Sequence, residues 1–223
     1  MIGAQIQMKG IFQFSLSAMF LVCSVTVYSQ TSVRTVETPA DVYGRIENSV
    51  YINDVFGFKL NIPNDGVVLN RAQTEVFRNA GADYLKGDNK ELGKKLDNEL
   101  QKQITVFNYV SKPLGATDNS SLVIAVAKQP VGATSNMVLA ETLKELAATG
   151  KFELVESLKG IRVGGAEFAG IVGKMSVSSL SVNVKFLISM RNGYSFCISS
   201  NYQSADGEKK ITDVLSSLQF QSK

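Results

Sequence analysis

The sequence predicts an α+β domain with a mainly antiparallel central sheet and helices packed on its faces, an α-β-α sandwich. Three observations predict it. Several runs alternate apolar and polar residues, which is the period of a half-buried strand. Leucines at helical spacing lie between those runs. Asn192-Gly193 joins two such runs, and both residues tolerate the positive φ of a tight hairpin. Helices that separate antiparallel strands are typical of the α+β class.

The N-terminal segment has the pattern of a secretory signal peptide. Lys9 is the only charged residue before Arg34, and an apolar stretch over residues 11–27 follows it. Small or tolerated residues then precede a cut site, which we place after Ser29. We therefore expect residues 1–29 to be a signal peptide and the protein to be exported, either to a periplasm or out of the cell.

Two alternatives to a cleaved signal stay open. An uncleaved membrane anchor would need roughly 20 apolar residues, and this stretch is shorter and interrupted by polar residues. A lipoprotein would be modified at Cys23, but Val22 before it is bulky for that signal. Translation can start at Met1 or at Met8, because Met8-Lys9 is a more usual opening for a signal peptide.

The next residues predict a tether and then the first strands of a single domain. Residues 30–48 are polar and aperiodic, which predicts a flexible tether, and we expect the folded domain over 49–223. Residues 50–52 predict a short strand. Residues 56–62 alternate, with their apolar members on one face, and 63–66 end the strand with turn residues.

Helical patterns follow. Residues 71–103 are predicted to be mostly helical, with a break near Gly87-Asp88 because glycine weakens a helix. A second helix is predicted over 137–148, and Gly150 stands where a helix commonly ends. The expected buried stripes are Leu85, Leu92, Leu96 and Leu100 in the first, and Leu139, Leu143 and Leu146 in the second.

The remaining elements are strands and a closing helix. A closing helix is expected after Ser204, whose side chain can cap it, with its acidic residues in the first turn. An exposed loop is expected over 112–121. The predicted strands are 104–110, 122–128, 152–158, 161–163, 166–177, 182–190 and 194–200.

The composition excludes several kinds of active site. The chain has no histidine and no tryptophan. Without histidine, it cannot build a Ser-His or Cys-His nucleophile or a His-bearing zinc site. Only Cys197 remains after signal cleavage, so no internal disulfide is expected. We expect Cys197 to be a buried small apolar residue, with an intermolecular disulfide as the alternative.

Some short patterns resemble ligand sites but are better explained as structure. The acidic residues between 83 and 99 alternate with lysines as on a solvated helix face, and no calcium-loop spacing is present. The glycines of 160–165 lie between strands, whereas a phosphate loop leads into a helix. The patterns are Asp83, Asp88, Glu91, Asp97 and Glu99; Asn64-Asp65-Gly66; Asp206-Gly207-Glu208; Gly160 to Gly165; and the glycosylation sequon Asn119-Ser120-Ser121.

The chain resembles the PsbP-like superfamily over about residues 48–221. The resemblance is carried by Phe56-Gly-Phe-Lys-Leu-Asn-Ile-Pro63, by the Val163-Gly-Gly-Ala166 hairpin, and by Asn192-Gly-Tyr-Ser-Phe196 with Leu215-Ser-Ser-Leu-Gln-Phe220. It implies an α-β-α sandwich that acts as a binding or assembly accessory rather than as an enzyme. Some PsbP-type subunits have metal-linked roles through histidine, and because this chain has none, metal binding is not carried over.

We therefore expect an exported, non-catalytic accessory protein that binds a protein partner or stabilises an envelope assembly. The alternative is a small-molecule or lipid binder with its pocket between sheet and helix. The net charge of +3 carries no long basic run, so no nucleic-acid partner is expected. We expect no enzyme activity, no cofactor and no metal, and membrane contact only through an uncleaved signal. The loops 63–70 and 112–121, with aromatic residues such as Phe77, Tyr84, Tyr109 and Tyr202, are candidates for a groove, but no site residue is assigned.

Overall fold

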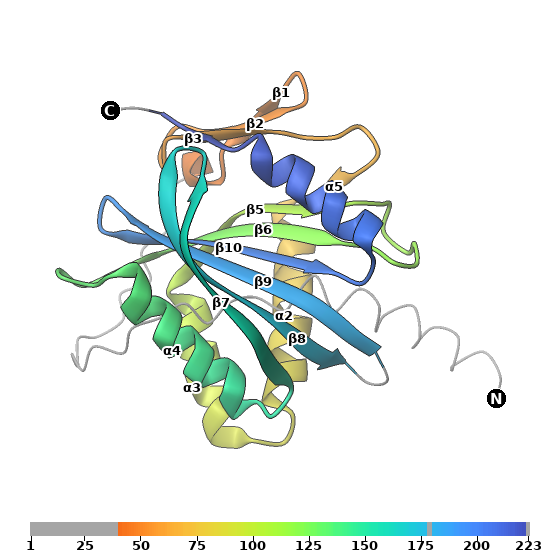
Figure 1. Ribbon diagram of the computed structural model, residues 1–223. Helices are drawn as coiled ribbons and strands as arrows, with labels where there is room; N and C mark the ends of the chain where they lie inside the picture. Colours follow the sequence, from red (N-terminus) through yellow and green to blue (C-terminus); the bar gives the residue numbers. More distant parts are fainter. Residues whose placement is uncertain (1–39, 178–179, 222–223) are drawn as a thin grey trace.

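The computed structural model describes residues 40–177 and 180–221. The signal peptide expected over 1–29 and the first part of the tether, 30–39, lie outside the described residues. The described chain forms an antiparallel α+β sandwich, as the sequence predicts (Figure 1). Helices cover one face of a large sheet, and a small sheet with one helix lies on the other side.

The large sheet is seven-stranded and has the order β4-β5-β6-β10-β9-β8-β7. All of its neighbouring strands are antiparallel. Its central strands are buried on both faces, which suits their almost continuous apolar sequences. The strands are β4 (Val67–Val68), β5 (Gln103–Val110), β6 (Ser121–Lys128), β7 (Phe152–Val163), β8 (Ala166–Val177), β9 (Leu180–Arg191) and β10 (Tyr194–Tyr202).

A second, four-stranded sheet has the order β1-β2-β3-β11. Its strands are β1 (Arg45–Glu47), β2 (Val50–Asn53), β3 (Phe58–Asn61) and β11 (Gln219–Phe220). The sequence pattern predicts one central sheet, and the structure corrects this. The last strand of the chain pairs with β3 at Phe220 and Phe58, and pairing between such distant segments leaves no local signal.

The helices form two groups. α2, α3 and α4 pack on the large sheet through Leu85, Leu96, Leu146 and the inward side chains of β8 and β9, whereas α5 packs on the other face through Ile211 and Val214. The predicted break at Gly87 is confirmed, since it separates α2 from α3. The helices are α2 (Arg71–Lys86), α3 (Lys90–Gln101), α4 (Ser135–Ala148) and α5 (Ala205–Ser216), and η2 (Ala40–Tyr43) is a short 3-10 helix.

Cys197 is free and buried in β10, as expected. Its side chain belongs to the core under the helices α2 to α4, whereas Phe196 and Ile198 belong to the core under the small sheet. The predicted opposite faces of this strand are therefore confirmed. With 1% of its surface exposed, the thiol behaves as a small apolar side chain.

The end of the expected tether is part of the fold. Residues 40–48 form η2 and β1, so the interpretation of these residues as a flexible tether is wrong. Hydrogen bonds to the backbone hold this segment: the side chain of Asn53 donates to the carbonyl of Val42 at 2.8 Å. The hydroxyl of Tyr51 lies 2.9 Å from the carbonyl of Tyr43. Contacts of this kind order a segment that has no apolar period of its own.

The β7–β8 hairpin is longer than predicted. The expected strands 152–158 and 161–163 form the single strand β7, with register shifts between Leu154 and Glu156 and between Leu158 and Ile161. Gly160, at a φ of 64°, lies in the second shift. A β-bulge explains why two predicted strands are one, because the extra residues interrupt the alternation without ending the strand.

Candidate functional site

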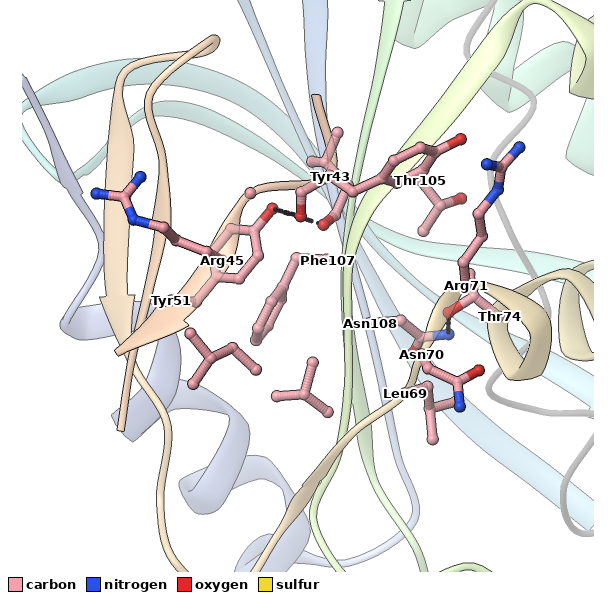
Figure 2. A pocket seen from close by; sticks show the side chains of 14 residues that line it. Tyr43, Arg45, Tyr51, Leu69, Asn70, Arg71, Thr74, Thr105, Phe107 and Asn108 are labelled. Atoms are coloured by element: carbon pink, nitrogen blue, oxygen red, sulfur yellow. Dashed lines mark hydrogen bonds between the residues drawn. The ribbon is translucent and has the colours of Figure 1, made fainter. Parts of the chain in front are cut away.

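A cleft of about 300 Å³ lies between the small sheet and the edge of the large sheet (Figure 2). One wall is formed by η2, β1 and β2, and the other by β4, the start of α2, and β5. It is lined by Tyr43, Gly44, Arg45, Ile46, Tyr51, Val68, Leu69, Asn70, Arg71, Thr74, Thr105, Val106, Phe107 and Asn108.

Tyr51 fixes the distance between the two walls. Its side chain is buried, and its hydroxyl lies 2.6 Å from the carbonyl oxygen of Val106 in β5 and 2.9 Å from that of Tyr43 in η2. The same hydroxyl accepts a bond from the side-chain nitrogen of Asn53 at 3.0 Å. Burial raises the pKa of Tyr51, although the bond from Asn53 acts in the opposite direction. The phenol therefore remains protonated and keeps η2 attached to β5.

The N-terminus of α2 places an arginine at the mouth of the cleft. Asn70 is the N-cap: it accepts from the backbone N–H of Gln73 at 2.9 Å, and Gln73 accepts from the backbone N–H of Asn70 at 2.9 Å. Arg71 is consequently the first residue of the helix. Its guanidinium carbon lies 4.8 Å from the centre of the Tyr43 ring, so a cation–π contact spans the two walls (Figure 2).

The charge of the cleft is positive. Of the described residues that line it, two are arginines and none is acidic. Arg45 is neutralised by Glu47 and Asp54. No carboxylate within 40–177 and 180–221 forms an ion pair with Arg71, because Glu75, one helical turn further on, binds Arg78 instead. Arg71 is therefore the arginine of the lining that has no ion pair within the described ranges.

The lining of the cleft includes buried apolar side chains and one buried amide. Leu69 and Phe107 are buried and supply apolar surface. Asn108 is 2% exposed, and its side-chain nitrogen lies 3.4 Å from the hydroxyl oxygen of Thr74. Its side-chain oxygen has no hydrogen-bond partner in the described part of the chain. That oxygen has almost no accessible surface, so it is enclosed by the protein and is not open to the cleft.

A second hollow of about 400 Å³ lies at the N-terminus of α4. It is lined by residues 134–136 of that end, 158–160 of β7 and 167–169 of β8. Lys159 and Glu167 both line it, and the side chains found buried without a partner lie elsewhere in the described chain. The two charged residues of this hollow therefore have opposite signs. Among its described side chains, none is buried with an unsatisfied hydrogen-bonding atom that a ligand could satisfy.

The short patterns noted in the sequence have structural roles. The acidic residues of 83–99 do not come together: Lys86 binds both Asp83 and Asp97, at 3.0 and 2.7 Å, and Glu99 binds Lys102. No group of residues suited to a metal ion occurs in the described ranges. In the first fragment resembling a metal loop, Asp65 binds Lys210 of α5 at 2.7 Å, and Lys210 lies two residues beyond the second fragment, Asp206-Gly207-Glu208.

The sequon and the glycine segment are also structural. The side-chain nitrogen of Asn119 donates to the carbonyl of Lys112 at 3.0 Å, and its oxygen accepts from the N–H of Lys112 at 3.0 Å. The amide thus closes the loop before β6, and Ser120 and Ser121 are buried. Gly164 and Gly165 form the β7–β8 turn with φ values of 58° and 84°.

Three of the aromatic residues named as candidates for a groove are held within the protein. Tyr109 and Tyr202 are buried, and Tyr84 donates to the carbonyl of Ser176 at 2.7 Å. The loop 63–70 does contribute to the cleft, through Leu69 and Asn70. Sequence reasoning missed the cleft residues Arg71 and Asn108. The cap at Asn70 was the available signal for the start of α2, but nothing in the sequence places it beside η2.

The chain has no match among protein-family models and none among curated proteins. Solved structures similar to it include cyanobacterial PsbP from Synechocystis sp. PCC 6803, at 13% identity over 77% of this chain and 91% of that one, with a TM-score of 0.47. Another is LpqN, involved in cell envelope biogenesis of Mycobacterium tuberculosis, at 14% identity over 74% and 83%, with a TM-score of 0.43. A third is a protein of unknown function from Pseudomonas aeruginosa, at 13% identity over 54% and 83%, with a TM-score of 0.42.

The expected likeness to PsbP is thus found among solved structures. At these identities and TM-scores it concerns the fold, and the activities of those proteins are not transferred to this chain. In the described ranges, none of the helices has the length and apolar character needed to cross a membrane.

Proposed function

We propose that the chain is an exported, non-catalytic accessory protein that acts by binding, and that the cleft between its two sheets is the binding site. The observation that carries the proposal is the composition of the cleft: an arginine at the mouth that has no ion pair in the described part of the chain, and apolar side chains beside it. Ligand pockets are mostly apolar hollows with a few polar groups that orient the ligand, and about 300 Å³ lies at the lower end of their volumes.

The same cleft gives no support to a catalytic role. Its lining has no histidine, cysteine, lysine or carboxylate, so the hydroxyls that line it, those of Tyr43, Tyr51, Thr74 and Thr105, have no such group beside them in the lining to act as their base. The hydroxyl of Tyr51, whose pKa burial raises, is bound within the protein. Export is supported by the sequence pattern of residues 1–29. Turnover by protein purified to homogeneity would refute the non-catalytic part of the proposal.

Binding in the cleft is tested on full-length protein freshly purified from its own host envelope. Native mass spectrometry should show a retained small molecule. Val68→Trp should abolish its retention, because Val68 lines the cleft and a larger ring would fill it. Val67→Trp is the matched control, since successive residues of a strand point to opposite faces and Val67 is not part of the lining. Absence of a ligand, or equal retention by both variants, would refute the cleft as its site.

A protein partner is the second candidate, and the edge strand β1 favours it. Among the described strands, β1 pairs with β2 alone, all three of its residues are exposed, and Ile46 is 53% exposed. An open edge can accept a strand from another chain. Affinity capture from the envelope should then return one stoichiometric protein, and Ile46→Pro should release it because proline cannot donate to the ladder. Retention by the proline variant would argue against this edge.

A further inference from the structure

One end of the molecule carries exposed apolar side chains on its turns. Val131 stands at the tip of the loop from β6 to α4, and its side chain is completely exposed, at 108% of the reference surface. Val55, in the turn from β2 to β3, is 45% exposed. At the base of the loop, the backbone N–H of Gln129 donates to the carbonyl of Gly193 in the β9–β10 turn at 2.8 Å. The loop and the β9–β10 turn therefore project from the same end (Figure 1).

Tyr194, the first residue of β10, connects the β2–β3 turn to this end. Its half-buried ring meets the ring of Phe56 edge-to-face, with 5.4 Å between the ring centres. In the sheet, Tyr194 lies opposite Lys128 of β6 on one side and Arg191 of β9 on the other. Residues opposite one another in antiparallel strands lie on the same face. This end thus combines exposed apolar turns, two aromatic rings and two cations.

The charge of this end is positive. Neither Lys128 nor Arg191 forms an ion pair with a carboxylate of the described residues. Of the carboxylates on neighbouring turns and strand ends, Asp54 is bound by Arg45, and Glu167 of β8 lies opposite an arginine of β7. α4, which follows the loop, has no acidic residue in its first turn, so its positive end is not offset there. A negatively charged partner is favoured.

The separation of the apolar residues favours a lipid surface over a protein surface. A protein interface is built around a closely packed apolar core. Here Val131 stands alone outside the fold, and Val55 belongs to a different turn. The boundary between headgroups and acyl chains accepts apolar side chains without such a core, and tyrosine is enriched at this level. Anionic headgroups also attract basic residues held close to them.

We propose that this end of the molecule docks on the surface of a bilayer with anionic headgroups. Val131 and Val55 enter the boundary region, and Tyr194 lies at the level of the headgroups. Lys128 and Arg191 face the headgroup phosphates. This contact goes beyond the proposed function and is independent of it, because none of these residues lines the cleft. It also differs from the expectation that membrane contact requires an uncleaved signal.

The test adds vesicles to the exported protein purified from its host, labelled with a polarity-sensitive fluorophore at Val131→Cys in a Cys23→Ser background. Cys197 is buried and should stay unlabelled. The vesicles contain phosphatidylcholine alone or with an equal part of phosphatidylglycerol. We expect emission from position 131 to shift to shorter wavelengths on the mixed vesicles. Val76→Cys is the matched control, because Val76 is 67% exposed on α2, away from this end, and its emission should not shift.

The role of charge is tested by titrating the labelled protein with the mixed vesicles. Lys128→Gln should weaken the apparent affinity about fivefold, the effect of one basic residue near an anionic surface. Lys174→Gln is the matched control, because it removes the same charge from an exposed residue near the opposite end of β8. It should leave the affinity close to that of the wild type.

A shift at position 131 but not at 76, with a loss of affinity in Lys128→Gln but not in Lys174→Gln, would support the proposal. No shift at 131, equal shifts at both positions, equal affinity for both kinds of vesicle, or equal effects of the two lysine variants would overturn it. A captured envelope protein that Val131→Asp releases, without vesicle binding, would show that this end binds protein instead. Val68→Trp, in the cleft, should leave vesicle binding unchanged, so the two proposals can fail separately.

Discussion

Lys95 of α3 and Glu145 of α4 form an ion pair of 2.8 Å in which the carboxylate is almost wholly buried and the ammonium is not. The side chain of Glu145 is 2% exposed and that of Lys95 is 36% exposed. Burial raises the pKa of Glu145 to about 7, against the opposing effect of Lys95. Burial also lowers the pKa of Lys95, but Glu145, Glu141 and Glu99 outweigh it and the net direction is upward. The ion pair joins α3 to α4. It also keeps the carboxylate of Glu145 in the interior, where a charge is poorly solvated.

Glu145 is expected to make stability depend on pH. The folded-state pKa lies above the ordinary value of 4.5, so the folded chain holds this proton more tightly than the unfolded chain. The proton on Glu145 contributes to folded-state stability at low pH, and this contribution is lost as pH rises through about 7. The free energy of unfolding therefore falls between about pH 5 and pH 8. Glu145→Gln should remove this part of the decrease in the free energy of unfolding with pH. Above pH 8 the variant should be more stable than wild type by on the order of 1–3 kcal/mol.

Urea unfolding across that pH range checks this prediction. Glu141→Gln is the control, since Glu141 lies on the same helix, is 26% exposed and pairs with Lys144 at 3.7 Å. It should keep most of the wild-type slope. An unchanged slope in Glu145→Gln would show that the buried carboxylate does not titrate in this range.

Tyr51→Phe should loosen the wall of the cleft. The change removes the hydroxyl that lies 2.6 Å from the carbonyl of Val106 and leaves that buried acceptor without this partner. We expect a loss of about 1–3 kcal/mol in the free energy of unfolding, measured by chemical denaturation. Tyr84→Phe is the matched control, because its bond to Ser176 lies at an exposed position and should cost less. Equal losses would contradict the role given to Tyr51.

Gly164 and Gly165 should differ although both have positive φ. A Cβ on Gly164 would lie 2.8 Å from the carbonyl oxygen of Leu218, whereas one on Gly165 would meet nothing within 4 Å. Gly165→Ala should therefore cost only the backbone strain, about 1–2 kcal/mol. Gly164→Ala should cost roughly 2 kcal/mol more, because it also pushes the β7–β8 turn away from the segment that leads into β11. Thermal and urea unfolding of both variants measure this difference in stability. Similar stabilities would show that Gly164 does not lie close to the carbonyl oxygen of Leu218.

Cys197 should be protected from thiol reagents. Its side chain is 1% exposed, and it lies in the core under α2 to α4. In a Cys23→Ser variant, where it is the only thiol, we expect labelling by Ellman's reagent to be at least roughly 100-fold slower than in denaturant, because it requires opening of the fold. Non-reducing electrophoresis should show a monomer. Rapid native labelling or a disulfide-linked dimer would instead favour the intermolecular alternative.

Local patterns in the sequence correctly predicted most elements of the fold. Phe58 and Leu60 are buried while Lys59 and Asn61 are exposed, as their alternation predicts. The leucine stripe from Leu85 to Leu100 is buried. These predictions hold because the face on which a side chain lies depends on the period of its own element. The split into two sheets was missed because it depends on the pairing of β11 with β3, far away in the chain. The folding of residues 40–48 was missed because it depends on hydrogen bonds from Tyr51 and Asn53, which leave no apolar period in the segment itself.

The sequence by itself determined the strand faces, the helix breaks, the capped start of α2 and the absence of histidine chemistry. Tertiary structure alone decided that Arg71, Asn108 and Tyr43 share one cleft, and that the carboxylate of Glu145 is buried beside Lys95. The physical reason is the separation along the sequence of the residues that interact. An element's period and its caps are set by neighbouring residues. The meeting of η2 with β5, and of α3 with α4, follows from the combined packing of segments that are not adjacent in sequence.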